Sequence, residues 1–290
     1  MTVFNLGSIN IDHFYRMPHL PQPGETLAAL GFEKGLGGKG ANQSVAALRG
    51  GARVVHIGAI GKGDGWTNGQ LALLGLDMGS IARVDATTGH AIILTDPAGE
   101  NVIIIHGGAN RTQSEEVIAR ALGSGQAADI LLLQNETSHQ VEAAIMAREH
   151  QMRVFYSAAP FELAPLKAIL PHVTHLLMNA GEAAALEAET GTKLADLPVQ
   201  VVVVTRGADG ADWISAEHQF HAPAFAVEPV DTTGAGDCFA GSLAAALDQG
   251  MTPEQALRFA SAAAAIQVTR PGTAGAMPEY HDVDVFLASQ

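Results

Sequence analysis

Asp231-Thr232-Thr233-Gly234-Ala235-Gly236-Asp237 is the stretch that decides the fold, because it predicts a glycine turn that leads into a helix. Phe239, Leu243 and Leu247 then recur every four residues, and Gly250 stands where a helix would end. The first N–H groups of a helix have no partner within it and favour an anion, and glycines let a ligand approach the backbone. The stretch therefore predicts either an anion site with the carboxylate of Asp237 at its mouth, or a plain turn in which Asp237 caps the helix.

The composition predicts a folded globular protein and argues against several kinds of partner. With 290 residues, 47% of them hydrophobic, the chain is long enough for a large core. Sixteen basic and thirty acidic residues give a formal charge of −14, so we expect no nucleic acid as a partner. No apolar run is long enough for a bilayer and the N-terminus shows no leader pattern, so we expect no membrane association and a cytoplasmic protein. The single cysteine, Cys238, rules out an intrachain disulfide and is expected to be a small core residue.

Short apolar runs alternate with helical stretches along most of the chain. The runs are residues 2–6, 54–57, 130–133, 154–156, 176–178 and 201–204, and the helical stretches are about 41–49, 66–75, 114–122 and 138–150. Such alternation predicts an α/β fold in which a mostly parallel sheet has helices on both faces. Because no linker or repeat interrupts the pattern, we expect a single α/β domain over residues 1–290.

Polar residues follow the apolar runs at the place where a parallel sheet binds its ligand, beyond the carboxyl ends of the strands. The residues found there are Gln134, Asn135 and Glu136, then Ser157, then Asn179 and Glu182, and finally Thr205, Arg206 and Gly207. Taken singly, each of them is an ordinary loop residue. A helix start that favours anions at the same edge predicts instead that they share one active site.

Two other segments lack a helical period and predict a small sheet outside the main fold. Residues 13–36 are punctuated by prolines and glycine. Residues 91–95 and 101–106 are strand-like, and the turn at 96–100 joins them into a hairpin.

A second glycine-rich stretch, Gly35-Leu36-Gly37-Gly38-Lys39-Gly40, contains the spacing G-x-G-x-x-G. A dinucleotide fingerprint has to follow the first strand of a βαβ unit, and here a proline-rich segment precedes it, so we reject that interpretation. Backbone N–H groups together with donors from Lys39 and Asn42 suit hydroxyls or a phosphate. The alternative is a tight turn into the helix at Ala41. The twelve histidines show no zinc-ligand spacing, which argues against a catalytic zinc.

Two signatures together identify the family that the chain resembles. Gly37-Gly38-Lys39-Gly40-Ala41-Asn42 and the stretch 231–237, in this order and separation, resemble the PfkB, or ribokinase-like, carbohydrate kinases over essentially the whole chain. Further similarity to the ribokinase branch of that family lies in residues 7–12, 100–102, 106–110 and 268–270. The resemblance implies a ribokinase-like α/β fold with a small β-sheet lid formed by about residues 12–36 and 88–107. Such lids often pair in this family, so the resemblance also implies a homodimer through the lid.

The resemblance implies an ATP-dependent sugar kinase that transfers the γ-phosphoryl group of ATP to a primary hydroxyl, in the first place converting D-ribose to ribose 5-phosphate. The sugar hydroxyls would be held by Asn10, Asp12, Gly38, Lys39, Asn42 and Glu136. Asp237 would accept the proton of the attacking hydroxyl, and the backbone of Gly234, Ala235 and Gly236 would form the anion hole. A helix N-terminus favours the ionised form of Asp237, so we expect a weak base, which a late proton transfer tolerates.

The resemblance also implies a nucleotide site and two ion sites. ATP would contact Asn179, Thr205, Gly207, Gly210, Gly236 and Ser261. Magnesium would be supported indirectly by Glu182, which forms the family's Asn-x-x-Glu element together with Asn179. A monovalent cation, K⁺, would lie beside the anion hole at Asp231, Thr233, Gln267, Arg270 and Gly272, largely through main-chain carbonyls.

The chain departs from the family pattern at several points. Only about nine residues separate Gly191 from the run at 201–204, too few for a crossover helix, so we expect the nucleotide side to be trimmed. Ser157-Ala158-Ala159-Pro160 stands where an Asn-Pro-Ala-Pro-like segment is usual. Ser261 stands where a larger polar ring often flanks adenine, and Ala276 replaces a small hydroxyl residue near the cation site.

Three alternatives to a ribose kinase stay open at this point. Another furanose-type substrate, such as deoxyribose, fructose or a nucleoside, would use the same chemistry, although an aromatic content of 5% disfavours stacking on a nucleoside base. A non-catalytic sugar or nucleotide sensor would have no need of Asp237 or of the anion-hole glycines. A dinucleotide-dependent reductase would bind NAD(P)H, which we do not expect.

Overall fold

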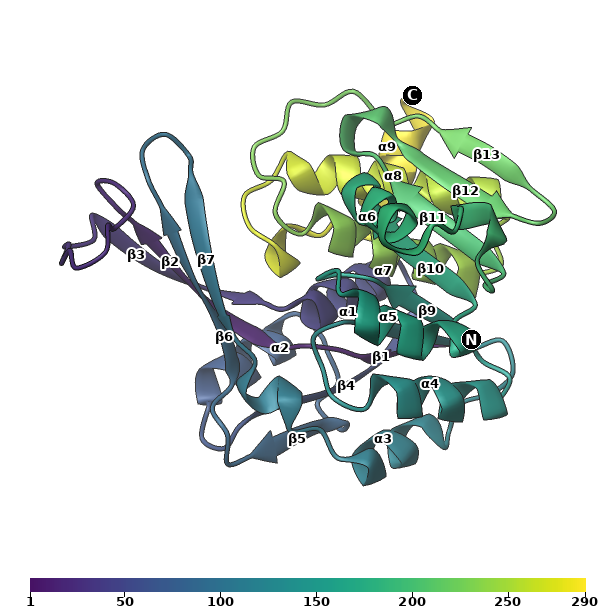
Figure 1. Cartoon of the computed structure of the whole chain (residues 1–290), viewed down its shortest axis with the longest axis horizontal. Helices are drawn as coiled ribbons and strands as arrows, with labels where there is room; N and C mark the ends of the chain where they lie inside the picture. The colour runs from purple at the N-terminus through teal and green to yellow at the C-terminus, as the bar shows by residue number, and fades with distance from the viewer.

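The computed structural model describes residues 1–290 and contains two sheets of different size (Figure 1). The large sheet has nine strands in the order β13-β12-β11-β10-β9-β8-β1-β4-β5. Its strands are β1 (Thr2–Leu6), β4 (Arg53–Gly61), β5 (Ile81–Val84), β8 (Ile130–Gln134), β9 (Arg153–Ser157), β10 (His175–Asn179), β11 (Val201–Thr205), β12 (Ala211–Ser215) and β13 (Gln219–Ala222). Neighbouring strands are parallel except at β11–β12 and β12–β13, which confirms the predicted mostly parallel sheet. The edge strands β5 and β13, and the strand β12 next to β13, were not predicted.

Helices cover both faces of the large sheet, as predicted. On one side are α1 (Lys39–Arg49), α2 (Gly65–Leu73), α7 (Ala235–Asp248), α8 (Pro253–Val268) and α9 (Tyr280–Ala288), and on the other α3 (Glu115–Leu122), α4 (Gln140–Glu149), α5 (Leu163–Ile169) and α6 (Ala180–Thr190). Successive strand residues point to opposite faces, so Leu132 packs in the first layer and Leu131 in the second. Burial on both faces explains why these strands are unbroken apolar runs. None of the helices combines the length and the apolar character that crossing a bilayer requires.

Helix α6, which was not predicted, is the crossover between the parallel strands β10 and β11, whereas the segment from Gly191 to β11 holds no α-helix, as its length predicted. The helix lies before Gly191 rather than after it. Asn179 and Glu182 form a capping box at its start, and Gly191 ends it in the left-handed conformation, with φ of 68°. The residues after Gly191 hold only the short 3₁₀ turn Leu194–Asp196 before β11 begins. The chain therefore keeps a complete βαβ unit at this point.

The small sheet projects from the α/β body and is built from the two segments predicted to form it (Figure 1). Its strands are β2 (Asn10–Arg16), β3 (Gly31–Gly37), β6 (Gly89–Thr95) and β7 (Asn101–His106), in the order β3-β2-β6-β7. The predicted hairpin is confirmed as the antiparallel pair β6–β7. Only residues 7–9 separate β1 from β2, so the small sheet is attached directly to the carboxyl edge of the large one.

Candidate active site

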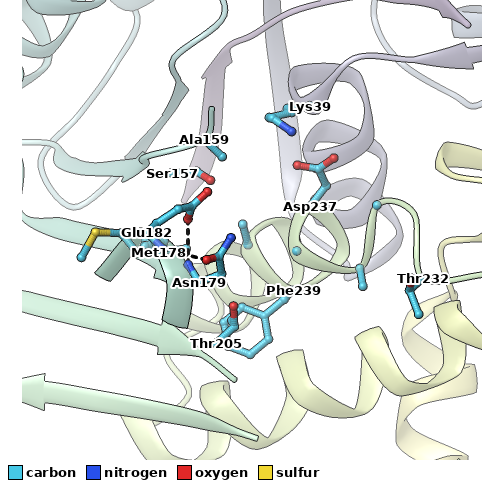
Figure 2. A pocket seen from close by; sticks show the side chains of 15 residues that line it. Lys39, Ser157, Ala159, Met178, Asn179, Glu182, Thr205, Thr232, Asp237 and Phe239 are labelled. Carbon is cyan, nitrogen blue, oxygen red and sulfur yellow. Dashed lines mark hydrogen bonds between the residues drawn. The ribbon is translucent and has the colours of Figure 1, made fainter. Parts of the chain in front are cut away.

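Four neighbouring strands of the large sheet present polar residues at one edge, where β10 and β11 end two residues beyond β8 and β9. Gln134 of β8 is opposite Ser157 of β9, and Asn179 of β10 is opposite Thr205 of β11. A cavity of about 210 Å³ lies at this edge, against the start of α7 (Figure 2). Its lining includes Lys39, Ser157, Asn179, Glu182, Thr205, Thr232, Gly234, Ala235, Gly236, Asp237 and Phe239. Of the polar residues predicted at this edge, Ser157, Asn179, Glu182 and Thr205 share one cavity with the start of α7. The others, Gln134, Asn135, Glu136, Arg206 and Gly207, do not line it.

The first turn of α7 leaves backbone donors free beside Asp237. Gly234 is the N-cap, with φ of 81°, a conformation that favours glycine. The N–H of Ala235 donates to the carbonyl of Thr232 at 3.2 Å, whereas the N–H groups of Gly234, Gly236 and Asp237 donate to no acceptor in the protein. The arrangement differs from the expected anion hole in one member, because Ala235 has no free donor and Asp237 has one.

Two amides from α1 hold the carboxylate of Asp237. Asn42 Nδ2 donates to Oδ2 at 2.9 Å, and Gln43 Nε2 donates to Oδ1 at 3.0 Å. Burial raises the pKa of Asp237 above its ordinary value, although Lys39 and the two amides act in the opposite direction. Burial thus acts against the expected effect of the helix N-terminus, which favours the ionised form of Asp237.

Lys39 lies next to Asp237 at the cavity (Figure 2). Burial lowers the pKa of Lys39, but the carboxylates around it, first of all those of Asp237 and Glu136, more than offset this and leave the pKa raised. Lys39 therefore stays charged at neutral pH. It supplies the positive charge that a phosphoryl group entering this cavity requires.

Residues expected to hold a sugar gather at the junction of the two sheets. The carboxylate of Glu136 accepts hydrogen bonds from the hydroxyl of Ser8 and, at 3.4 Å, from the N–H of Lys39. Asn10 Oδ1 accepts from Asn110 Nδ2 at 2.8 Å, which fixes the orientation of the Asn10 amide. These contacts connect the end of β8 with the start of β2 and with the start of α1.

Asp12 on β2 packs against the glycine turn that precedes α1. A Cβ atom at Gly37 would collide with the Asp12 carboxylate, and one at Gly38, where φ is 92°, would lie 2.8 Å from backbone atoms of the β1–β2 connection. Burial, and next the neighbouring carboxylate of Glu136, raise the pKa of Asp12 to about 6. The structure thus brings together all six residues expected to hold the sugar, namely Asn10, Asp12, Gly38, Lys39, Asn42 and Glu136.

A larger cavity of about 680 Å³ adjoins the first one. The two cavities share Asn179, Thr205, Thr232, Ala235, Gly236 and Phe239. All six residues expected to contact ATP line the larger cavity, namely Asn179, Thr205, Gly207, Gly210, Gly236 and Ser261. Phe225, Val227 and Val268 give it an apolar part as well, which suits an aromatic base, while the shared polar residues suit a phosphate chain.

Asn179 and Glu182 have a structural function that the family motif does not suggest. Asn179 Oδ1 accepts from the N–H of Glu182 at 2.9 Å, and Glu182 Oε2 accepts from the N–H of Asn179 at 2.7 Å (Figure 2). This capping box begins α6. Both residues also line the smaller cavity, and burial raises the pKa of Glu182 although Asn179 and Lys39 lower it. The carboxylate thus serves the helix start through Oε2, and Oε1 takes no part in the capping box.

The five residues expected around a monovalent cation lie close together, but hydrogen bonds within the protein already join them. Asp231 accepts the N–H groups of Thr233 and Gly272 at 2.9 and 3.0 Å. Gln267 Nε2 donates to the carbonyls of the same two residues at 2.9 and 3.1 Å. The N–H of Arg270 donates to the carbonyl of Gln267 at 2.9 Å, while its guanidinium pairs with a carboxylate of α9 at 3.0 Å. Two of the main-chain carbonyls expected to bind a cation, those of Thr233 and Gly272, therefore already accept a side-chain donor.

A buried polar chain behind Asp237 was not predicted. Gln134 Nε2 donates to Gln43 Oε1 at 2.7 Å and to Asn5 Oδ1 at 2.9 Å. Asn5 in turn donates to Ser44 Oγ at 2.9 Å. A signal for this chain exists in the sequence, because Asn5 interrupts an apolar strand, and a buried polar residue needs a partner.

Comparisons with known proteins agree with the geometry. A family model described as pfkB family carbohydrate kinase matches residues 2–279. A ribokinase of Haemophilus influenzae is 35% identical over 302 aligned residues, which cover 99% of this chain and 98% of that protein. The crystal structure of ribokinase from Thermotoga maritima has a TM-score of 0.89 at 34% identity, with 99% of each chain covered. The structure of Arabidopsis thaliana ribokinase complexed with ribose and ATP has a TM-score of 0.85 at 27% identity, with 99% of this chain and 98% of that chain covered.

Proposed function

The chain belongs to the pfkB family of carbohydrate kinases, and on this basis we propose that it transfers the γ-phosphoryl group of ATP to the primary hydroxyl of D-ribose. One observation carries the proposal: Asp237 lies where the residues of the sugar side meet the free N–H groups of α7. A proton acceptor and an anion hole are thereby side by side, as phosphoryl transfer to a hydroxyl requires. Ribose as the acceptor is supported by the similar ribokinases, one of them complexed with ribose and ATP.

In the proposed reaction the sugar lies between β2 and Asn42, with its primary hydroxyl against Asp237. Asp237 accepts the proton of that hydroxyl while the oxygen attacks the γ-phosphorus, and the bond from phosphorus to the bridging oxygen breaks, so that ADP leaves. The N–H groups of Gly234 and Gly236, with the ammonium group of Lys39, stabilise charge on the transferred group. Because the transition state is loose, positioning and charge matter more here than the strength of the base.

We place ATP along the two adjoining cavities, with its phosphates in the smaller and its adenine in the larger. Magnesium fits the smaller cavity, because Mg²⁺ binds mainly phosphate oxygens and water and needs few protein ligands. The carboxylate of Glu182, with Oε1 outside the capping box, would hold the ion there through water. When bound, the ion would neutralise part of the charge on the phosphates.

Potassium is not part of the proposed mechanism, because the residues expected to hold it do not fit it. The carbonyls of Thr233 and Gly272 accept hydrogen bonds from Gln267, and the carboxylate of Asp231 accepts two N–H groups. A cation at this point would have to displace the amide of Gln267.

The small sheet is proposed to be a lid, formed by about residues 12–36 and 88–107, that pairs with a second copy of the chain. The cross-strand register puts Ile103 and Ile105 on the same face of the sheet as Asp12. Ile103 and Ile105 are 54% and 60% exposed. Adjacent apolar side chains on an open sheet need cover, and closure over the sugar together with contact to a second copy supplies it.

The cytoplasm is the proposed place of the reaction. ATP is available there, and Cys238 is buried and unpaired, which suits a reducing compartment. The formal charge of −14 disfavours nucleic acid as a partner.

A coupled assay of ADP release over D-ribose, deoxyribose, fructose and nucleosides tests the proposal. Ribose is expected to give the highest kcat/KM, and a lack of turnover with every acceptor would sink the proposal. Preference for another acceptor would keep the kinase and correct the substrate. Asp237→Asn is expected to lower kcat by about 10³-fold with sugar binding retained, because the hydroxyl loses its proton acceptor, whereas a non-catalytic sensor would be indifferent to the change.

A further inference from the structure

Asp231 and Gln267 both bind the main chain of Thr233 and Gly272, Asp231 as an acceptor and Gln267 as a donor. The carboxylate of Asp231 accepts the N–H groups of Thr233 and Gly272, and the amide nitrogen of Gln267 donates to the carbonyls of those residues. The loop before α7 and the loop after α8 are thus joined by hydrogen bonds of 2.9 to 3.1 Å. Gln267 is 0% exposed, whereas Thr233 and Gly272 lie at the surface.

Two carbonyls that converge on one point are satisfied by a cation, by water or by a hydrogen-bond donor between them. A primary amide has two N–H groups on one nitrogen, which suits two such carbonyls. We propose that the amide nitrogen of Gln267 takes the place of a monovalent cation, and that this chain therefore works without K⁺. The inference rests on the proposed kinase function. Ala276 agrees with it, because it brings no side-chain oxygen where the family resemblance implies a hydroxyl.

Gln267 acts on the anion hole through the peptide bond between Thr233 and Gly234. This bond is trans and planar, so its carbonyl and its N–H point in opposite directions. By holding the carbonyl of Thr233, Gln267 fixes the direction of the Gly234 N–H, one of the free donors beside Asp237. Gln267 does not touch the reacting atoms and is therefore a positioning residue.

The competing possibility is that the side-chain amide of Gln267 has the opposite orientation. Oε1 of Gln267 is buried and has no hydrogen-bond partner. If the amide were rotated by half a turn, Oε1 would face the two carbonyls, and the three oxygens would repel one another unless a cation lay between them. In that case K⁺ would stabilise the native protein.

The first test measures cation binding without catalysis. The purified protein is kept in tetramethylammonium chloride, and its unfolding temperature is recorded after exchange of that salt for KCl, NaCl or CsCl at constant ionic strength. If the amide replaces the cation, the unfolding temperature stays within about 1 °C in all four salts. A larger, saturable rise that is specific to KCl would overturn the inference, because it would show that the native state binds K⁺.

Two variants of Gln267 provide the second test. Gln267→Ala frees the two carbonyls and opens space, so in tetramethylammonium we expect kcat for ribose to fall about tenfold and to recover in KCl, with an unfolding temperature that now depends on K⁺. Gln267→Met fills the space without a donor, so kcat is expected to stay low in every salt. Wild-type kcat should vary less than about twofold among the salts. Strong K⁺ activation of the wild type, or wild-type kcat in both variants, would contradict the inference.

Gln249→Ala is the matched control. Gln249 Nε2 also bridges two carbonyls, those of Gly50 at 2.6 Å and Ala245 at 3.2 Å, at the opposite end of α7. Its loss is expected to lower the unfolding temperature by the same amount in all salts. If no sugar is phosphorylated in any salt, the proposed function fails while the unfolding temperatures still decide the inference. If ribose is phosphorylated only with K⁺, the function holds and the inference fails.

Discussion

Gln43 Nε2 lies 3.0 Å from Oδ1 of Asp237, so the proposed base is held by a residue 194 positions earlier in the chain. The other end of the same amide accepts a hydrogen bond from Gln134 at 2.7 Å, which fixes its orientation. Asn42 holds the second carboxylate oxygen. Asp237 is therefore fixed at both oxygens, and Gln43 positions it from within the core.

Gln43→Leu keeps most of the side-chain volume and removes both hydrogen bonds of the amide. We expect kcat to fall about tenfold with little change in the KM for ribose, because Asp237 loses its fixed orientation while the sugar contacts stay. Asn42→Ala is the comparison, since Asn42 is proposed to contact the sugar and its loss should also raise KM. Steady-state kinetics separate the two, and an equal rise of KM in both variants would argue against a positioning role for Gln43.

Asp12→Asn tests the raised pKa of Asp12, about 6 against an ordinary 3.8. The folded protein binds this proton more tightly than the unfolded chain does. The protonated carboxyl of Asp12 therefore stabilises the folded protein by about 3 kcal/mol below about pH 4, and this stabilisation is lost as the pH rises through 6. The variant is therefore expected to gain stability relative to the wild type between about pH 4 and pH 7. Urea unfolding of the variant and the wild type at pH 4 and pH 7 measures the difference between their free energies of unfolding. A difference that is the same at both pH values would contradict the raised pKa.

Gly38→Ala is expected to damage the sugar side of the site. The new methyl group would lie 2.8 Å from Asn10 N and Ser8 O, in a backbone conformation that disfavours alanine. We expect a loss of about 2 kcal/mol in stability and a loss of ribose binding in calorimetric titration. Gly69→Ala in α2 is the control, because its methyl group would meet nothing within 4 Å and alanine favours a helix, so a gain of about 0.5 kcal/mol is expected. Wild-type ribose affinity in Gly38→Ala would show that this close approach is not needed.

The double change Ile103→Glu and Ile105→Glu tests the proposed pairing of the lids. Two charges on this face would be buried without partners in a dimer, so we expect sedimentation velocity to show a dimer for the wild type and a monomer for the variant. Leu73→Glu on α2 changes a side chain that is 80% exposed and should leave the dimer intact. A wild-type monomer at all concentrations would refute the pairing.

Much of the fold follows from local pattern, because strands buried on both faces, such as β8 and β11, are unbroken apolar runs. The rule that ligands lie at the carboxyl ends of parallel strands then brings Glu136, Asn179 and Thr205 to one edge without any knowledge of distances. Helix α6 was overlooked, because Asn179 and Glu182 were interpreted only as part of a nucleotide site. Their spacing is also that of a capping box, and the structure uses it in this way.

Features that depend on distances between remote segments could not be predicted. The raised pKa of Asp237 follows first of all from its burial, which depends on how α1 and α7 pack together. The position of Gln267 between Thr233 and Gly272 depends on the separation of two loops, which no sequence spacing encodes. The family resemblance implies that Gln267 binds a cation through its main-chain carbonyl. In the structure its side-chain amide instead donates to the carbonyls of Thr233 and Gly272.

Residues 7–9 alone connect β1, which is held inside the large sheet, with β2, which carries Asn10 and Asp12 into the small sheet. Any rotation of the proposed lid about this connection moves Asn10 and Asp12 with it, because they belong to its first strand. Recognition of the sugar and closure of the lid then occur in a single step. A sugar that offers no hydroxyl to Asp12 would lose affinity and closure together, so selectivity among sugars should be visible in kcat as well as in KM.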